Sequence, residues 1–223
     1  MKRLLLILLL LSAFVISQGQ SIVKANSFYT TRTATTSGGA EYSDDFESYS
    51  AGNLDGNGNW EAWIDHIILY KPSSTVSAYP GNASGLSGAW YDDDFDNDQW
   101  SQNGGYTSVN SGYYMGVGVR MSGSGATADG YFYGGGSNGT YMYKVINGAY
   151  TTFGSSGDAV EADDVLKITV SGTTITAYKN GSIDTSVGTS GTATDSDLSS
   201  GKAGIGGYYS GGNYVPDWSG GDL

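Results

Sequence analysis

The chain has 223 residues, no cysteine, 36 glycines, 18 tyrosines and a formal net charge of −12. Its glycine share is about twice the usual value of roughly 7%. Without cysteine, stability must come from packing rather than from disulfides. The negative charge repels nucleic acid and anionic membranes at long range, so neither is an expected partner.

Residues 1–19 have the pattern of a secretory signal peptide. Two basic residues precede an apolar run over 4–16, and small residues stand at Ser17 and Gly19, where a cleavage site prefers them. The apolar run is shorter than the roughly 20 residues that span a bilayer. We therefore expect a cleaved leader, secretion to the exterior or the periplasm, and no membrane insertion afterwards. Removing its two basic residues takes the charge from −12 to −14.

The region after the leader divides into an arm and one folded domain. Residues 20–41 are rich in Thr, Ser and Gly without sustained periodicity, which is typical of a flexible linker or arm. Residues 42–223 are long enough for a single domain with a real core. Within it, residues 43–47 predict a first strand and 52–59 a loop.

Residues 60–70 are ambiguous, because their large apolar side chains fall at helical spacing. The β-branched isoleucines and the lack of helical segments nearby favour strands instead. Further short strands are predicted at 99–102, 113–121, 130–133, 140–146, 149–153, 165–170, 174–179, 182–187, 203–208 and 215–218.

The last third of the chain carries the clearest pattern. Residues 165–170 alternate large apolar with polar side chains, a tight turn at 171–173 follows, and 174–179 run back to a second turn at Asn180-Gly181. Tight turns between period-2 runs predict an antiparallel meander. With the many other short strands, this predicts an all-β, two-sheet antiparallel β-sandwich or a barrel.

A series of short motifs occurs in a characteristic order: Asp44–Phe46, Asn97–Ser101, Gly116–Arg120, Tyr143–Gly148, Asp164–Ile168, Tyr178–Gly181, Gly204–Tyr208 and Asp217–Gly221. Together they resemble the concanavalin A-like lectin/glucanase superfamily, in its laminin G-like, bacterial and phage-associated branch. The resemblance covers residues 42–223 and implies a jelly roll with one concave sheet. It implies no particular activity, because this superfamily includes lectins, adhesion modules and glycosidases.

The acidic residues do not match the catalytic pattern of that superfamily. Its glucanases carry Glu-x-Asp-x-(x)-Glu on one strand, which brings an acid and a nucleophile onto the concave face. The chain has four Glu, and its nearest approach, Glu161-Ala162-Asp163-Asp164, lacks the second Glu. His66 is the sole histidine and is expected at a strand edge. With one histidine and no cysteine, the chain has few of the residues that a catalytic triad or dyad needs. We therefore expect no enzyme.

Calcium is the one cofactor that the acidic residues suggest. The run Asp92–Asp98 offers oxygen ligands but fails the EF-hand pattern, so it is either a calcium loop or a solvated acidic loop. In related jelly rolls, an Asp on the last strand and oxygens near the first strand share a structural ion. The resemblance thus implies a calcium site at Asp217, Asp44 and Glu47.

A glycine trough is the best candidate for a binding site. Alternation along 116–121 places apolar residues on one face and Gly116, Gly118 and Arg120 on the other. Sugar rings stack on aromatic side chains and accept hydrogen bonds from Arg or Lys. Alternatively, the tyrosines are ordinary half-buried strand residues and Arg120 pairs with an acid. The expected ligand-binding residues are Arg120, Tyr131, Tyr133, Lys144 and Trp100.

We therefore expect a secreted, noncatalytic, lectin-like module that binds a glycan on its concave sheet. One alternative is a divergent glycoside hydrolase or polysaccharide lyase. Another is a structural or adhesion module of a cell-surface or virion assembly. Residues 207–214 form a loop rich in glycine and tyrosine, either a second aromatic contact surface or a flexible surface loop.

Overall fold

The computed structural model describes residues 39–71, 75–82, 85–154, 156–209 and 212–223. The predicted leader and the predicted arm up to residue 38 lie outside them. Apart from a short 3-10 helix, all regular elements are strands, which confirms the all-β prediction. In the described part of the chain, no helix is long and apolar enough to cross a membrane.

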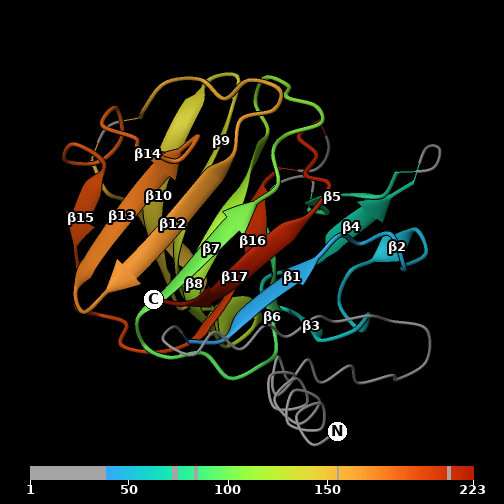
Figure 1. The fold of residues 1–223 in the computed structure, drawn as a ribbon, viewed down its shortest axis with the longest axis horizontal. Helices are drawn as coiled ribbons and strands as arrows, with labels where there is room; N and C mark the ends of the chain where they lie inside the picture. Colours follow the sequence, from blue (N-terminus) through green and yellow to red (C-terminus); the bar gives the residue numbers. More distant parts are fainter. Residues whose placement is uncertain (1–38, 72–74, 83–84, 155, 210–211) are drawn as a thin grey trace, which may run out of the picture.

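Two large antiparallel sheets form a sandwich, with the first in front in Figure 1. In the first sheet, six strands follow one another in a single order, and a seventh, β15, pairs with β13 outside that order. Its strand order is β1 (Glu41–Asp44), β17 (Trp218–Asp222), β7 (Gln99–Asn103), β12 (Leu166–Ser171), β13 (Thr174–Lys179) and β14 (Ser182–Ile183), and β15 is Thr192–Thr194.

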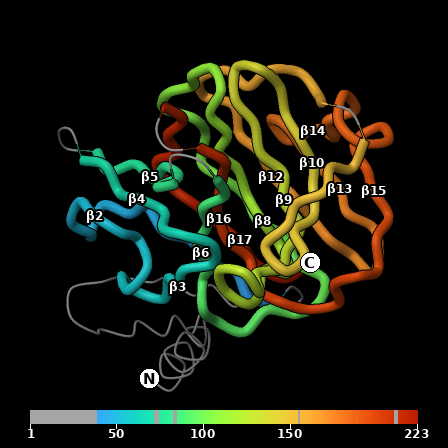
Figure 2. The backbone as a smooth tube through the Cα atoms, turned by 180° about the vertical axis from the view of Figure 1, so that it is seen from behind, coloured from blue at the N-terminus to red at the C-terminus, as the bar shows by residue number. Residues whose placement is uncertain are grey.

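The second sheet lies behind the first and faces the reader in Figure 2. Its strand order is β11 (Ala149–Thr152), β10 (Gly139–Ile146), β9 (Asp129–Gly136), β8 (Tyr114–Ser122), β16 (Lys202–Tyr208), β6 (Leu86–Tyr91) and β3 (Trp60–Ala62). A small third sheet at one side of the sandwich has the order β2 (Gly52–Asn53), β4 (Ile67–Tyr70) and β5 (Ser77–Pro80).

The predicted meander is confirmed as β12, β13 and β14, with Ile168 opposite Ala177 and a turn at Asn180, whose φ is 53°. Residues 60–70 are strands, as expected, but they split into β3 and β4, which belong to different sheets. The first strand ends at Asp44, earlier than predicted, because Phe46 turns the chain with a φ of 56°.

The main core fills the space between the two large sheets. It includes the inward-facing side chains Val117, Val119, Ile168, Ile175 and Ile205, all fully buried. Such burial is worth roughly 1.5–3 kcal/mol for each large aliphatic side chain. A second, smaller cluster covers part of the outer face of the second sheet and consists of Trp63, Leu86, Met121, Ala128, Phe132, Tyr143 and Val145.

A β-bulge at the end of β8 reverses the side-chain alternation there. Val119 lies opposite Tyr131, but Ser122 lies opposite Asp129, so β8 holds one residue more than β9 between these pairs. Arg120 has a φ of 50°, in the left-handed region. An extra residue turns the following side chains to the other face. Met121 therefore packs on the outer face and Arg120 is buried.

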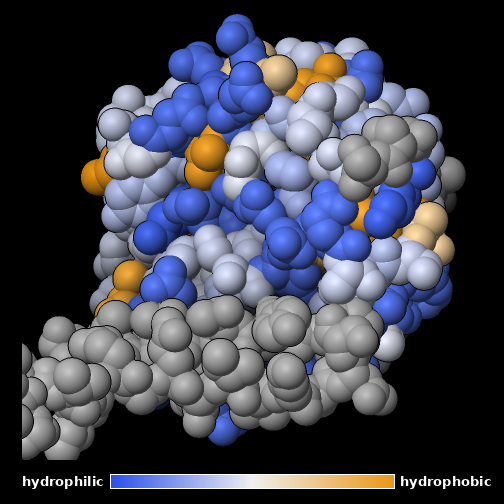
Figure 3. Space-filling model, turned by 45° about the vertical axis from the view of Figure 1, so that its right-hand side comes forward, coloured by the Kyte–Doolittle hydropathy of each residue, from blue (hydrophilic) through white to orange (hydrophobic). Residues whose placement is uncertain are grey.

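The surface is mostly hydrophilic, with hydrophobic residues visible only as small separate spots on the face seen in Figure 3. Among the described residues, the large hydrophobic side chains with substantial exposure are Tyr70, Tyr150, Ile183, Tyr209 and Leu223. Three of these five are tyrosines, whose rings also carry a hydroxyl group.

Candidate functional site

A row of glycines crosses the outer face of the second sheet. Gly134 lies opposite Gly116, Gly116 opposite Gly206, and Gly206 opposite Gly88. Tyr141 continues the row on β10, opposite Gly134. The trough predicted from residues 116–121 therefore exists on the outer face, and it extends over neighbouring strands.

Aromatic rings fill part of this trough. A Cβ added at Gly118 would lie 2.7 Å from the Phe132 ring, and one at Gly206 would lie 2.6 Å from it. Trp63 covers Gly88 in the same way, at 2.6 Å. Trp63 also stacks on Phe132, with ring centroids 5.6 Å apart and planes 10° from parallel. These glycines admit rings against the backbone, so this end of the trough is packed rather than open.

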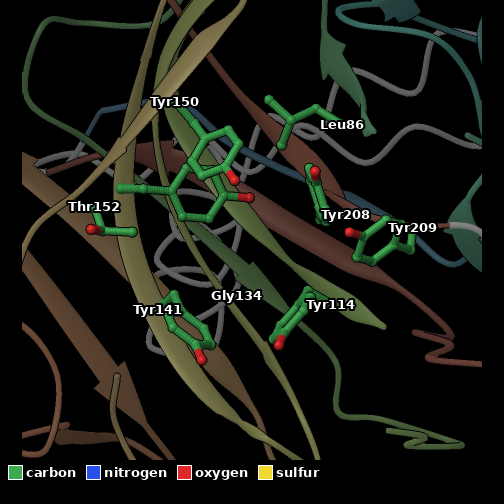
Figure 4. Close-up of a pocket in the computed structure, with 9 residues that line it drawn as sticks. Leu86, Tyr114, Gly134, Tyr141, Tyr150, Thr152, Tyr208 and Tyr209 are labelled. Atoms are coloured by element: carbon green, nitrogen blue, oxygen red, sulfur yellow. The ribbon is translucent and has the colours of Figure 1, made fainter. Parts of the chain in front are cut away.

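The open end is a pocket of about 340 Å³, and six of its nine lining residues are tyrosines. Figure 4 shows Tyr150 and Thr152 on one side, Tyr208, Tyr209 and Leu86 on the other, and Tyr141 and Tyr114 facing each other at one end. The residues that line the pocket are Leu86, Tyr114, Gly134, Tyr141, Tyr143, Tyr150, Thr152, Tyr208 and Tyr209.

Four rings of the pocket form one connected group. Tyr143, Tyr150, Tyr208 and Tyr209 follow one another, with successive centroids 6.1, 5.6 and 4.2 Å apart. Tyr143 also stacks on Phe132 of the packed cluster at 5.4 Å. This group is thereby anchored on the sheet at one end. At the opening of the pocket, Tyr150 and Tyr209 are 52% and 37% exposed.

The pocket carries hydroxyl groups on a mainly apolar lining and is uncharged at neutral pH. A hydrogen bond with Tyr209, followed by burial, raises the pKa of Tyr208 to about 12. Burial, and then the neighbouring Tyr141, raises the pKa of Tyr114, and burial raises that of Tyr143. The hydroxyls therefore stay protonated and can both donate and accept hydrogen bonds. None of the lining residues is Asp, Glu, Lys, Arg or His, so none of them carries a charge at pH 7.

Tyr131 and Tyr133 do not reach this pocket, so their predicted role as stacking surfaces is wrong. They share a face, as expected, but it is the inner face, opposite Val119 and Val117 in the core, and both are fully buried. Their hydroxyls donate to Asp195 at 2.7 Å and to Asp184 at 2.5 Å.

Arg120 is also not an exposed donor, because the bulge turns its side chain inward. It is only 3% exposed. Its Nε and Nη2 donate to the carbonyl oxygen of Asn97 at 3.1 and 2.9 Å, and Nη1 donates to that of Leu198 at 2.7 Å. The Asp98 carboxylate lies 3.8 Å from Nη2. The guanidinium thus donates to backbone oxygens at the rim of the sandwich rather than to a ligand.

Lys144 is committed to the protein as well. Its Nζ lies 2.6 Å from an oxygen of Asp195 and also contacts Asp197. Tyr131 contacts the same Asp195, and Arg120 binds Leu198 close by. The structure thus brings three of the five predicted residues together, but they anchor residues 195–198 to the rim of the sandwich.

Trp100 lies on β7, in the first sheet, and therefore on the opposite layer from the pocket. Lys167 covers its ring, with Nζ 4.2 Å from the ring centroid. The expectation that Trp100 and Lys144 share one binding face is wrong, because β7 belongs to the first sheet and β10, which carries Lys144, to the second.

The residues proposed for calcium do not form a joint ion site. The Asp44 carboxylate accepts hydrogen bonds from the Tyr49 hydroxyl at 2.6 Å and from Trp60 Nε1 at 2.8 Å, and Glu47 accepts one from the Val76 amide at 3.0 Å. Over the ranges that the structure describes, no group of three or more His, Asp or Glu side chains could hold a metal ion. Calcium binding at Asp44, Glu47 and Asp217 stays a prediction.

The buried carboxylates predict how stability depends on pH. Burial alone would raise the pKa of Asp195, but hydrogen bonds from Lys144 and Tyr131 lower it overall. The pKa of Asp184 is lowered in the same way, because hydrogen bonds from Ser186 and Tyr133 outweigh the effect of burial. A carboxyl group whose pKa is lower in the folded state stabilises the fold above its unfolded pKa, near 3.9, and loses that contribution as pH falls through the folded value.

We therefore expect the free energy of unfolding to fall steeply below about pH 4, and Asp195→Asn to flatten this dependence while lowering stability at pH 7. Denaturant melts between pH 2 and pH 7 measure both effects. Asp158→Asn, at an exposed position, is the matched control and should follow the wild-type curve. A wild-type slope in the Asp195 variant would show that this carboxylate does not couple to folding.

Sequence reasoning missed most of the pocket residues. Alternation along 141–146 places Tyr141 and Tyr143 on the face opposite Met142, and the segment 207–214 is rich in tyrosine, but the sequence connects neither with the glycine row. The missing signal was the register, because Tyr114 lies opposite Tyr208 only in the folded sheet.

Comparison with known proteins identifies the class of fold. No protein-family model matches the chain, and no curated protein matches it. Among solved structures, the carbohydrate-binding module CBM66 from Bacillus subtilis is similar, with a TM-score of 0.54 and 14% identity over 76% of this chain and 96% of that one. An endo-acting O-glycanase of the human gut microbiota has a TM-score of 0.52 and 9% identity over 81% and 98%.

A lichenase derived from a mouse hindgut metagenome has a TM-score of 0.49 and 13% identity, over 82% of this chain and 98% of that one. The chain has the concanavalin A-like lectin/glucanase fold, a β-sandwich that a carbohydrate-binding module and a glycanase share. Identities this low show the fold alone, and the laminin G-like branch stays a prediction.

Proposed function

We propose that this chain is a noncatalytic carbohydrate-binding module that takes a neutral glycan into the tyrosine pocket. The observation that carries the proposal is the composition of the walls, in which partly exposed tyrosine rings surround a hollow of sugar size on one face of the sandwich. Carbohydrate binding is also a function found among proteins of this fold.

Such walls suit a sugar for two reasons. A pyranose ring presents C–H groups that pack on an aromatic face, and each aromatic contact is worth about 0.5–1.5 kcal/mol beyond burial. Its hydroxyls can also exchange hydrogen bonds with tyrosine hydroxyls at the rim. Since the chain carries a net charge of −12, it should favour neutral glycans over acidic ones.

The lining of the pocket favours binding without cleavage. Most glycosidases need two carboxyl groups roughly 5–9.5 Å apart across the scissile bond. The residues that line this pocket include no Asp or Glu. The predicted leader supports the same role, because a secreted module would meet polysaccharides outside the cell.

A glycan array that carries neutral and acidic glycans tests this proposal. We expect the protein to bind one or more neutral glycans, to bind acidic glycans weakly or not at all, and to release no reducing ends from the bound polymer. Release of reducing ends would instead support the hydrolase alternative. Self-association without any glycan binding would support the structural module.

A further inference from the structure

A second group of tyrosines lies outside the pocket, on the small third sheet. Tyr70 on β4, Tyr79 on β5 and Tyr214 before β17 touch one another, with ring centroids 5.3 to 6.3 Å apart. We call these three rings the tyrosine platform. Tyr70 is 46% exposed, and the other two are partly exposed.

The platform is not part of the core. The opposite face of the small sheet carries Ile67 and Leu69, which are buried in the main core. Tyr70 follows Leu69 on β4, and alternation turns it to the outer face. Three rings that meet on a surface cover one another only in part, so an aromatic face stays open to solvent at Tyr70.

The platform and the pocket are built from neighbouring elements. One short segment supplies Tyr208 and Tyr209 to the pocket and Tyr214 to the platform. The Val215 and Ala78 backbones exchange hydrogen bonds of 2.8 and 3.1 Å, which fix this segment to β5. A Cβ at Gly207 would lie 2.5 Å from the Pro80 ring, so β16 and β5 also approach closely.

We infer that the tyrosine platform is a second stacking site for the same neutral polysaccharide whose other residues occupy the pocket. The inference rests on the proposed function. Tyrosine rings offer a flat apolar face with a hydroxyl edge, which suits sugars, and the negative charge of the chain opposes acidic polymers and anionic membranes at this surface.

Two sites on one rigid domain have a consequence for ligand length. A polymer that reaches both sites gains affinity, because its second contact is intramolecular, whereas an oligosaccharide that fills only one site gains nothing. The ligand class is therefore a neutral polysaccharide rather than a short glycan or a chain end.

Affinity electrophoresis and calorimetry with Tyr70→Ala test the inference. The first probes are laminarin with laminaritriose, dextran with isomaltotriose, and soluble galactan with galactotriose, extended to whichever neutral polysaccharide the array identifies. We expect Tyr70→Ala to weaken polymer binding about five-fold, roughly one stacking contact, and to leave trisaccharide binding unchanged. Tyr70→Phe should keep the wild-type affinity for both.

Two further variants separate the possible outcomes. Ile183→Ala removes a side chain of similar exposure, 47%, from β14 and should change neither affinity. Tyr150→Ala, in the pocket, should weaken both the polymer and the trisaccharide. If only Tyr150→Ala weakens the polymer, the second site is wrong and the proposed function stands. If the wild-type chain binds a neutral oligosaccharide but no neutral polysaccharide, the second site is wrong. If it binds no neutral glycan of either length, both are wrong.

Discussion

Replacing Arg120 with alanine is expected to lower the free energy of unfolding by about 3 kcal/mol, and the melting temperature by roughly 6–12 °C. The substitution removes the three hydrogen bonds that the guanidinium donates to the Asn97 and Leu198 carbonyl oxygens. It leaves those carbonyl oxygens without these charged donors and opens a cavity where the buried Arg120 side chain lay. Thermal and denaturant melts measure the loss.

A suitable control is Lys202→Ala, because Lys202 is more exposed and pairs with an exposed Asp92 at 3.5 Å. That change should cost no more than about 1 kcal/mol. The Arg120 variant should keep its glycan affinity at a temperature where it stays folded. A variant that melted like the wild-type but lost glycan binding would return Arg120 to the role of ligand donor and would contradict its structural role.

Removing two rings at the mouth of the pocket is expected to abolish most glycan affinity. The double substitution Tyr150→Ala and Tyr209→Ala should weaken binding about 30-fold, since two stacking contacts together are worth about 2 kcal/mol. Both side chains are partly exposed, at 52% and 37%, so the fold should tolerate their loss. Calorimetric titration with the glycan found on the array measures the change.

Ile183→Ala is again the control for a lost exposed side chain, and Tyr150→Phe with Tyr209→Phe separates stacking from hydrogen bonding. The Phe pair should keep most of the affinity if ring stacking dominates. Unaltered affinity in the alanine pair, with wild-type binding intact, would place the glycan elsewhere on the molecule.

Local pattern alone predicted much of the fold. The meander of β12, β13 and β14 followed from period-2 runs and from the Asn180-Gly181 turn, whose left-handed backbone that sequence favours. The fold class and the jelly-roll fold implied by the resemblance are confirmed, since both depend on the number and order of short strands. The glycines of 116–121 do face outward, as alternation required.

The binding residues were harder to predict, for two physical reasons. Strict alternation fails at Arg120, because one extra residue in β8 exchanges the faces of Arg120 and Met121, and no residue type signals that bulge. Alternation also shows which residues share a face of a strand, but it does not show which of the two faces lies in the core. Tyr131 and Tyr133 were placed on a shared face correctly, but their side of the sheet became the core.

Residues far apart in sequence build the pocket, so only the three-dimensional register defines it. Tyr114 and Tyr208 come from strands separated by most of the domain and lie opposite each other across β8 and β16. Leu86 joins them from β6, opposite Tyr208. Three of the residues predicted to bind a ligand instead hold residues 195–198, because hydrogen-bonding side chains at a sandwich rim find backbone and carboxylate partners within the protein.

The most direct test of the tyrosine pocket is a titration of tyrosine-labelled protein with the bound oligosaccharide, followed by nuclear magnetic resonance of the ring carbons. We predict saturable shifts at Tyr141, Tyr150, Tyr208 and Tyr209, and small or no shifts at the core residues Tyr131 and Tyr133. Shifts confined to Tyr178, on the first sheet, with none among the pocket rings would place the glycan on the opposite layer and contradict the proposed function of the pocket.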